Sequence, residues 1–147
     1  MSEPLVFHME GHPRGKGRPR ATARGGFARM FTDAKTREYE TAVAGLARQA
    51  MGSRRPLDGP LGVTIRFRIE PPKSMTKRAR AAVLAGEQPY LGRFDLDNLA
   101  KSILDGCNGV CFVDDVQIVR LFLSKVASDR PGVDVRVEAY EPQGGTT

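Results

Sequence analysis

Five aspartates and one lysine lie within residues 95–115, in a pattern that could bind a divalent metal ion. Asp95 and Asp97 stand two residues apart, Lys101 follows four residues later, and Asp114 and Asp115 are adjacent. Carboxylate oxygens are hard ligands that suit Mg2+ or Mn2+. Such an ion polarises a phosphoryl oxygen and lowers the pKa of a bound water. The pattern therefore points to the hydrolysis of a phosphate ester.

An amphipathic helix is the element that must position the first two carboxylates. Apolar residues recur at helical spacing, which predicts a helix that Asp95 and Asp97 open and that ends near Asn108. The members of the apolar stripe are Leu96, Leu99, Ala100, Ile103 and Leu104. Asp114 and Asp115 come at the start of the next strand, and a carboxylate there reaches the same volume if the helix packs on the sheet. Lys101 lies one turn after Asp97, where it could steady a carboxylate or place a positive charge near the phosphate.

Ordinary structural roles also account for each of these residues. Aspartate is a common N-cap, and Asp97 with Lys101 is a common exposed i,i+4 pair worth about 0.3–0.5 kcal/mol. Asp114 and Asp115 could be turn residues before a strand. Asp105 has moved around the helix relative to Asp97, so we interpret it mainly as solvated surface. The metal site is favoured by the gathering of acids in a protein that is otherwise basic.

The basic residues are concentrated near the N-terminus and suggest a polyanionic partner. The chain carries 23 Lys and Arg against 17 Asp and Glu, a net charge of +6, and residues 12–37 alone hold eight basic groups and one acid. Glycine and proline prevent a regular element over residues 11–26, so we predict a long basic loop whose cations contact phosphates. The expected phosphate contacts in this loop are Arg14, Lys16, Arg18 and Arg20. Lys73, Lys77 and Arg78 form a second, weaker basic cluster, and either set could instead be merely solvated.

The chain length and composition favour one domain over residues 1–147. Apolar residues make up 40% of the 147 residues, which is enough for one sizeable core. No apolar run approaches the ~20 residues that span a bilayer, and the N-terminus has no secretory signal pattern, so we expect a cytoplasmic protein. Cys107 and Cys111 could join His8 and His12 in a zinc set, but small core thiols are the favoured interpretation.

Hydrophobic periodicity predicts an α+β fold with a mixed β-sheet packed with helices. The clearest strand is Leu61 to Glu70, where Val63, Ile65, Phe67 and Ile69 alternate with polar residues. The predicted strands are 5–10, 27–31, 61–70, 116–126 and 133–140, and the predicted helices are 34–51, 74–85 and the helix that Asp95 opens. Residues 141–147 are expected to be a frayed tail.

The combined motif resembles the RusA family of Holliday junction resolvases. The signature D-x-D-N-x-x-K followed by D-D-x-x-V is similar to Asp95 through Lys101 and then to the run from Val113 to Val119. The segments Gly17-Arg18-Pro19-Arg20, Phe31-Thr32 and Lys35 to Glu40 are similar to the front half of phage-type members, and the likeness runs from about Leu5 to Tyr140. Phe94 departs from the pattern, since members often carry proline or a basic residue there.

The resemblance implies a small α+β homodimer that binds four-way DNA junctions and cuts two strands symmetrically with Mg2+. By this resemblance Asp95, Asp97 and Asp115 bind the metal, Lys101 is the functional lysine, and Asp114 is an acid of less certain role. A catalytically silent protein that binds branched DNA is the alternative, although all candidate ligands are present. A metal-dependent phosphohydrolase of nucleotides is a third possibility, and the strongly basic N-terminal stretch exceeds what one small phosphate ester requires.

Overall fold

A computed structural model describes residues 3–16, 20–22, 29–31 and 34–142 of the chain. Its elements follow the predicted order closely. The strands are β1 (Leu5–Glu10), β2 (Arg20–Thr22), β3 (Arg29–Phe31), β4 (Leu61–Ile69), β5 (Ile118–Ala127) and β6 (Gly132–Ala139). The helices are α1 (Ala34–Met51), α2 (Lys77–Leu84), α3 (Leu96–Cys107) and the short 3-10 helix η2 (Asp115–Gln117).

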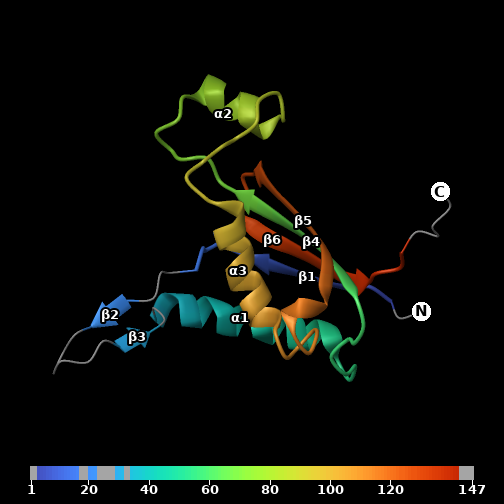
Figure 1. The fold of residues 1–147 in the computed structure, drawn as a ribbon. Helices are drawn as coiled ribbons and strands as arrows, with labels where there is room; N and C mark the ends of the chain where they lie inside the picture. The colour runs from blue at the N-terminus through green and yellow to red at the C-terminus, as the bar shows by residue number, and fades with distance from the viewer. Residues whose placement is uncertain (1–2, 17–19, 23–28, 32–33, 143–147) are drawn as a thin grey trace.

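Four strands form one mixed sheet in the order β1-β6-β4-β5 (Figure 1). β6 runs antiparallel to β1 and β4, whereas β5 runs parallel to β4 with Phe67 beside Lys125. β2 and β3 pair with each other in a separate two-stranded sheet, and α2 stands beyond the end of the main sheet. The predicted α+β fold with a mixed sheet is confirmed.

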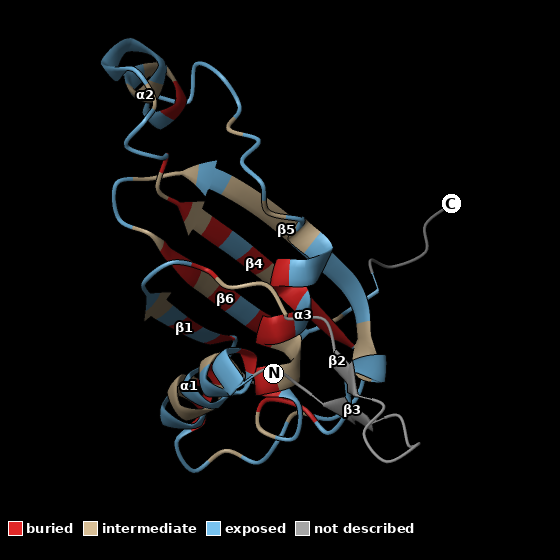
Figure 2. Ribbon diagram, turned by 90° about the vertical axis from the view of Figure 1, so that its left-hand side faces the viewer, coloured by how far each residue is buried: buried red, intermediate tan, exposed pale blue. Residues whose placement is uncertain are grey.

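The core lies between one face of the main sheet and the helices α1 and α3 (Figure 2). β4 alternates as its sequence predicts, and Val63, Ile65 and Phe67 are buried. α3 packs closely on α1 because Gly106 has no side chain: a Cβ there would lie 2.7 Å from the Val43 side chain. None of the described helices combines the length and apolar character that a bilayer crossing requires.

Two parts of the predicted secondary structure are wrong. Residues 20–22 form β2, so the segment 11–26, expected to be a loop throughout, contains a short strand. The strand expected at residue 116 begins at Ile118, because Asp115–Gln117 first make a turn of 3-10 helix. Residues 143–147 of the expected tail lie outside the described residues.

The sheet face opposite the helices is polar and centred on Asp134. The Asp134 carboxylate lies 2.8 Å from Nδ1 of His8, 3.3 Å from Nε of Arg66 and 3.2 Å from Nε of Arg68. Partial burial raises the pKa of the Asp134 carboxyl, but the hydrogen bond from His8 and the charge of Arg68 outweigh it. The net pKa lies below its ordinary value, so the charged form stabilises the fold.

We predict that Asp134→Asn lowers the free energy of unfolding by about 1 kcal/mol at pH 7. A folded-state pKa that is depressed contributes stability above the unfolded pKa, and this contribution is lost as the pH falls through the folded pKa. The deficit of the variant should therefore shrink as urea denaturation is repeated from about pH 5 towards pH 2. Asp129→Asn, in the exposed turn after β5, is the matched control. A deficit that is the same at every pH would contradict the role of the charge.

Candidate functional site

Four polar residues at the start of α3 line one small pocket of about 250 Å³. They are Asp95, Asp97, Asn98 and Lys101, and all four are exposed. The opposite side of the helix, with Leu99 and Ile103, is buried in the core, and this anchoring fixes which side of α3 the pocket occupies. The structure thus brings Asp95, Asp97 and Lys101 together, as the sequence predicts.

The two carboxylates of this pocket make neither of the local interactions that aspartates at a helix start commonly make. Asp95 is the N-cap residue of α3, yet its side chain makes no capping hydrogen bond. Within the described part of the chain, no ion pair within 4 Å joins Asp97 to Lys101. Both ordinary alternatives, the aspartate cap and the i,i+4 pair, are therefore unsupported. Uncommitted carboxylate oxygens beside a helix N-terminus, with an amide and a lysine, suit a hydrated Mg2+ and a phosphate group.

The Asp114-Asp115 turn is held in place by Gln117. The Oε1 atom of Gln117 accepts hydrogen bonds from the backbone N–H groups of Val113 and Asp114, at 2.9 and 3.0 Å. Its Nε2 atom donates to the carbonyls of residues 57 and 59, each at 3.0 Å. Gln117 therefore clamps the acidic turn to the loop before β4. Sequence reasoning gave it no role, although Asp114 and Gln117 have the spacing of a capping box.

Neighbouring acids perturb Asp115. A hydrogen bond with Asp114 raises the pKa of Asp115, and burial and the charges of Asp114 and Asp105 raise it further, against the opposing charge of Lys101. The turn therefore lies beside the polar edge of α3. Like charges held close together favour protonation of one of them, and a divalent cation would relieve the repulsion.

The carboxylates nevertheless fall into two groups. Among the described residues, no set of three or more histidine, cysteine, aspartate or glutamate side chains is close enough to hold one ion. Asp95 and Asp97 share the pocket, whereas Asp115 interacts with Asp114, Asp105 and Lys101. The expected ligand set of Asp95, Asp97 and Asp115 is not preassembled, and it stays a prediction.

The zinc alternative finds no support in the described residues. His8 binds Asp134, and Nε2 of His12 lies 3.8 Å from Glu70. Cys107 and Cys111 are both buried, and the hydrogen bond between their thiols raises the pKa of Cys107. The two cysteines are core thiols, as the sequence analysis favoured.

The first part of the basic segment packs against α3. Pro13 is buried, and the Arg14 carbonyl accepts a hydrogen bond of 2.7 Å from the Ser102 hydroxyl. The Lys16 backbone N–H donates to the Asn98 carbonyl at 3.3 Å. Gly15 lies so near the Asn98 side chain that a Cβ there would be 2.4 Å from its amide nitrogen. Residues 12–16, hereafter the arm, therefore pack beside Asn98, which is one of the four residues that line the pocket.

Lys16 is an internal counter-ion rather than a solvated cation. Its ammonium group forms an ion pair with Asp105 and lies 3.6 Å from Oε1 of Glu40. The hydrogen bond to Asp105 raises the pKa of Lys16, burial lowers it, and the charges of Asp105 and Glu40 raise it again. Asp105, interpreted from the sequence as solvated surface, is thus half-buried and paired.

The other candidate DNA contacts are placed only in part. Lys73, Lys77 and Arg78 are exposed at and before the start of α2. Arg14 is half-buried, Arg18 lies outside the described residues, and the side chain of Arg20 in β2 is not described.

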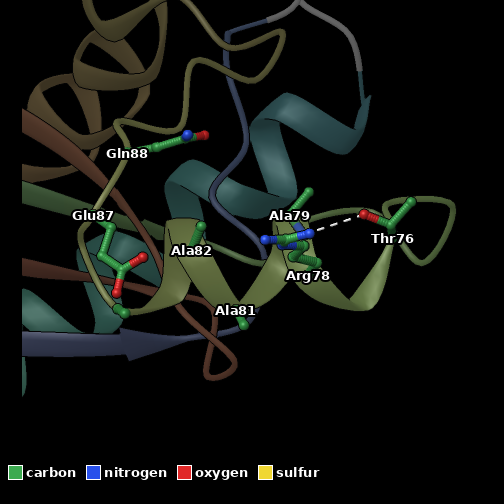
Figure 3. A pocket seen from close by; sticks show the side chains of 8 residues that line it. Thr76, Arg78, Ala79, Ala81, Ala82, Glu87 and Gln88 are labelled. Atoms are coloured by element: carbon green, nitrogen blue, oxygen red, sulfur yellow. Dashed lines mark hydrogen bonds between the residues drawn. The ribbon is translucent and has the colours of Figure 1, made fainter.

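A larger hollow than the pocket on α3 lies away from the acids, along α2. It measures about 650 Å³ and is open, and Figure 3 shows Arg78, Ala82, Glu87 and Gln88 around it, with Thr76 accepting the capping hydrogen bond from Ala79. A wall of alanines with one carboxylate offers no group arrangement for hydrolysis. The smaller pocket on α3 is therefore the better candidate site.

We predict that Lys16→Gln lowers the free energy of unfolding by about 1–2 kcal/mol, because Asp105 and Glu40 lose their counter-ion. The slope of log K against log salt for DNA binding should change by far less than the ~0.9 expected for one phosphate contact. Urea denaturation and binding titrations at several salt concentrations measure the two quantities. Lys77→Gln, an exposed change on α2, should show the reverse: a lower slope and unchanged stability. If Lys16→Gln instead lowered the slope and left stability unchanged, Lys16 would be a phosphate contact and not an internal counter-ion.

Comparisons with known proteins identify the family of the chain. The chain is 31% identical over 138 residues to the uncharacterized protein YqaN of Bacillus subtilis strain 168, and this match covers 90% of the chain and 94% of that protein. The family model described as endodeoxyribonuclease RusA matches residues 10–138, which include the arm, α3 and the Asp114-Asp115 turn. The chain belongs to the RusA endodeoxyribonuclease family.

Proposed function

We propose that this protein is a Mg2+-dependent endonuclease that resolves four-way DNA junctions by paired, symmetric cuts. The observation that carries the proposal is the pocket at the start of α3, where Asp95 and Asp97 are uncommitted and Lys101 stands beside them. Family membership supports action on DNA. The protein as a whole is basic, which favours binding to DNA. Carboxylates by themselves would repel the phosphates of DNA, so these acids fit a role in binding a metal ion.

In this proposal the acidic residues bind the metal ion and the basic residue stabilises the phosphate. Asp95, Asp97 and Asp115 would hold the ion, with Asp114 setting the protonation of Asp115. The ion would polarise the scissile phosphate and supply an activated water when bound. Lys101 places a positive charge where negative charge develops on the phosphate oxygens. The unpaired N–H groups at the start of α3 offer further donors to a phosphate.

Substrate size separates this proposal from hydrolysis of a nucleotide. Lys77 and Arg78 are exposed on α2, which stands beyond the end of the main sheet, and Lys73 is exposed shortly before that helix (Figure 1). Cations spread over several elements match an extended phosphate backbone better than one small ester. A silent binder would have no need of carboxylates left without local partners.

We predict that Asp97→Asn reduces Mg2+-dependent junction cleavage by at least about 100-fold, while junction binding survives or tightens. The amide keeps the shape of the side chain but removes a ligand charge and its repulsion of phosphate. Cleavage of a synthetic four-way junction, a linear duplex and a single strand, each with and without Mg2+, measures the effect. Asp129→Asn serves as the control outside the site. No cleavage of any DNA by the natural protein, despite tight binding, would favour the silent binder.

A homodimer is the second part of the proposal, and β5 is its candidate interface. β5 lies at the edge of the main sheet, and its outer side has no partner strand among the described residues. It carries Val119, Leu121 and Phe122 with 56%, 42% and 62% of their surface exposed. A long apolar edge strand is unfavourable unless another strand or chain covers it. Pairing with a second copy would cover it and give two equivalent sites for the two equivalent strands of a junction.

We predict that a mixed dimer with one Asp115→Asn subunit nicks one strand of a junction but gives few resolved duplexes within one binding event. Each acidic site would serve one strand only, so one defective subunit leaves one strand uncut. Subunits with different affinity tags allow the mixed dimer to be purified, and the all-natural dimer is the control. Phe122→Lys should shift the mass from dimer towards monomer in light scattering. Full paired cutting by the mixed dimer, or an active natural monomer, would contradict this arrangement.

A further inference from the structure

The connector between α2 and α3 is tied to the sheet by one lysine. Lys125 in β5 donates hydrogen bonds from its ammonium group to the carbonyls of Leu91 and Phe94, the latter at 2.9 Å. Lys125 stands beside Phe67 of β4 in the sheet register, and Phe67 is buried in the core, so Lys125 is on the face that α3 covers. Its side chain is half-buried.

The second of these carbonyls belongs to the residue directly before Asp95. Asp95 has extended backbone angles, φ −79° and ψ 125°, and its carboxylate makes no capping bond. An N-cap aspartate ordinarily bonds a backbone N–H of the first turn and so fixes the start of its helix. Here the bonds from Lys125 hold the preceding backbone from outside, and the Asp95 carboxylate remains available to a ligand.

Lys125 has little capacity left for direct contact with DNA. An ammonium group has three N–H donors, and two carbonyls already accept from it. A phosphate bound by Lys125 would have to compete with both carbonyls. Among the described residues, the backbone–backbone hydrogen bonds outside helices and strands include none from residues 88–94, so Lys125 provides the polar tether of this segment.

We propose that Lys125 is a positioning residue for the metal site: it fixes the backbone directly before Asp95, whose own carboxylate makes no capping hydrogen bond. The inference rests on the proposed function for its catalytic consequence, but the tether itself is a property of the folded chain. Lys125 acts through Asp95 and touches neither the metal nor the phosphate.

The backbone offers a reporter of this tether that needs neither DNA nor metal. The Leu99 N–H donates to the Asp95 carbonyl at 3.0 Å and closes the first turn of α3, and the Asn108 N–H donates to the Leu104 carbonyl, also at 3.0 Å, at the other end. Loss of the tether should open the first turn and leave the last one closed. We expect Lys125→Met to speed hydrogen exchange at the Leu99 amide about tenfold, with Asn108 unchanged.

The same variant has a distinct signature in catalysis. Lys125→Met should raise the Mg2+ concentration for half-maximal cleavage by about tenfold. Junction affinity should stay within about twofold, and its salt dependence should not change. Lys125→Arg, which retains N–H donors, should restore Leu99 protection and most of the metal response. Arg48→Met, an exposed change on α1, is the control for loss of a cation.

The possible results separate the tether from its alternatives. Unchanged exchange at Leu99 in Lys125→Met would overturn the inference, as would a salt slope lowered by ~0.9, the mark of a phosphate contact. Faster exchange at both Leu99 and Asn108 would mean that the variant destabilises the whole fold. Lys125→Gln, with two N–H donors on a shorter side chain, then carries the same test. If the natural protein does not cleave DNA, the proposed function fails, but the exchange at Leu99 still decides whether Lys125 holds the start of α3.

Discussion

The burial of one apolar stripe of α3 is the constraint on which the rest of the site depends. Leu99, Ala100 and Ile103 are almost fully buried, and Gly106 lets α1 approach within contact of the same helix. The rotation of α3 about its axis is therefore fixed, because turning the helix would expose this stripe and bury charges. Asp97, Lys101 and Asp105 follow at four-residue intervals and must share the opposite edge. Any substrate that uses Asp97 is thereby presented with Lys101 as well.

Charge is balanced locally rather than over the whole chain. Although the protein carries a net charge of +6, Asp105 is paired with Lys16, while Asp95 and Asp97 have no ion pair among the described residues. The basic arm thus neutralises Asp105, two turns beyond Asp97 on α3, and leaves the pocket acids unpaired among the described residues. Asp115, whose pKa is raised by Asp114, interacts both with the paired Asp105 and with Lys101 of the pocket. A divalent cation bound between the pocket acids and Asp115 would replace the repulsion among the carboxylates with attraction to the ion, and so would draw the two carboxylate groups together.

Local patterns in the sequence predict the elements well and the partners poorly. The alternation in β4 and the helical spacing in α3 reflect burial against a common core, and a pattern of burial is visible in one segment alone. The pairing of Lys16 with Asp105 spans 89 positions, and nothing in either segment distinguishes a buried counter-ion from a solvated charge. β2 escaped prediction because three residues are too few to show alternation. Gln117 and Lys125 act on backbone carbonyls and amides, which every residue has, so no partner residue could have indicated their roles.

The edge strand β5 connects the site with the proposed dimer. One side chain of β5, Lys125, holds the backbone that leads to Asp95, while the outer edge and the side chains of Val119 and Phe122 are exposed. An edge strand with one paired side exchanges more easily with open states than a central strand does. If a second copy covers β5, the strand gains a second row of backbone hydrogen bonds, and Lys125 is anchored on a stiffer element. Assembly would then order the start of α3 in both subunits together. A monomer would keep the same residues but hold Asp95 less firmly. Pairing through β5 would therefore do two things: it would bring two sites into one complex, and it would order each site for one of the two cuts that a junction requires.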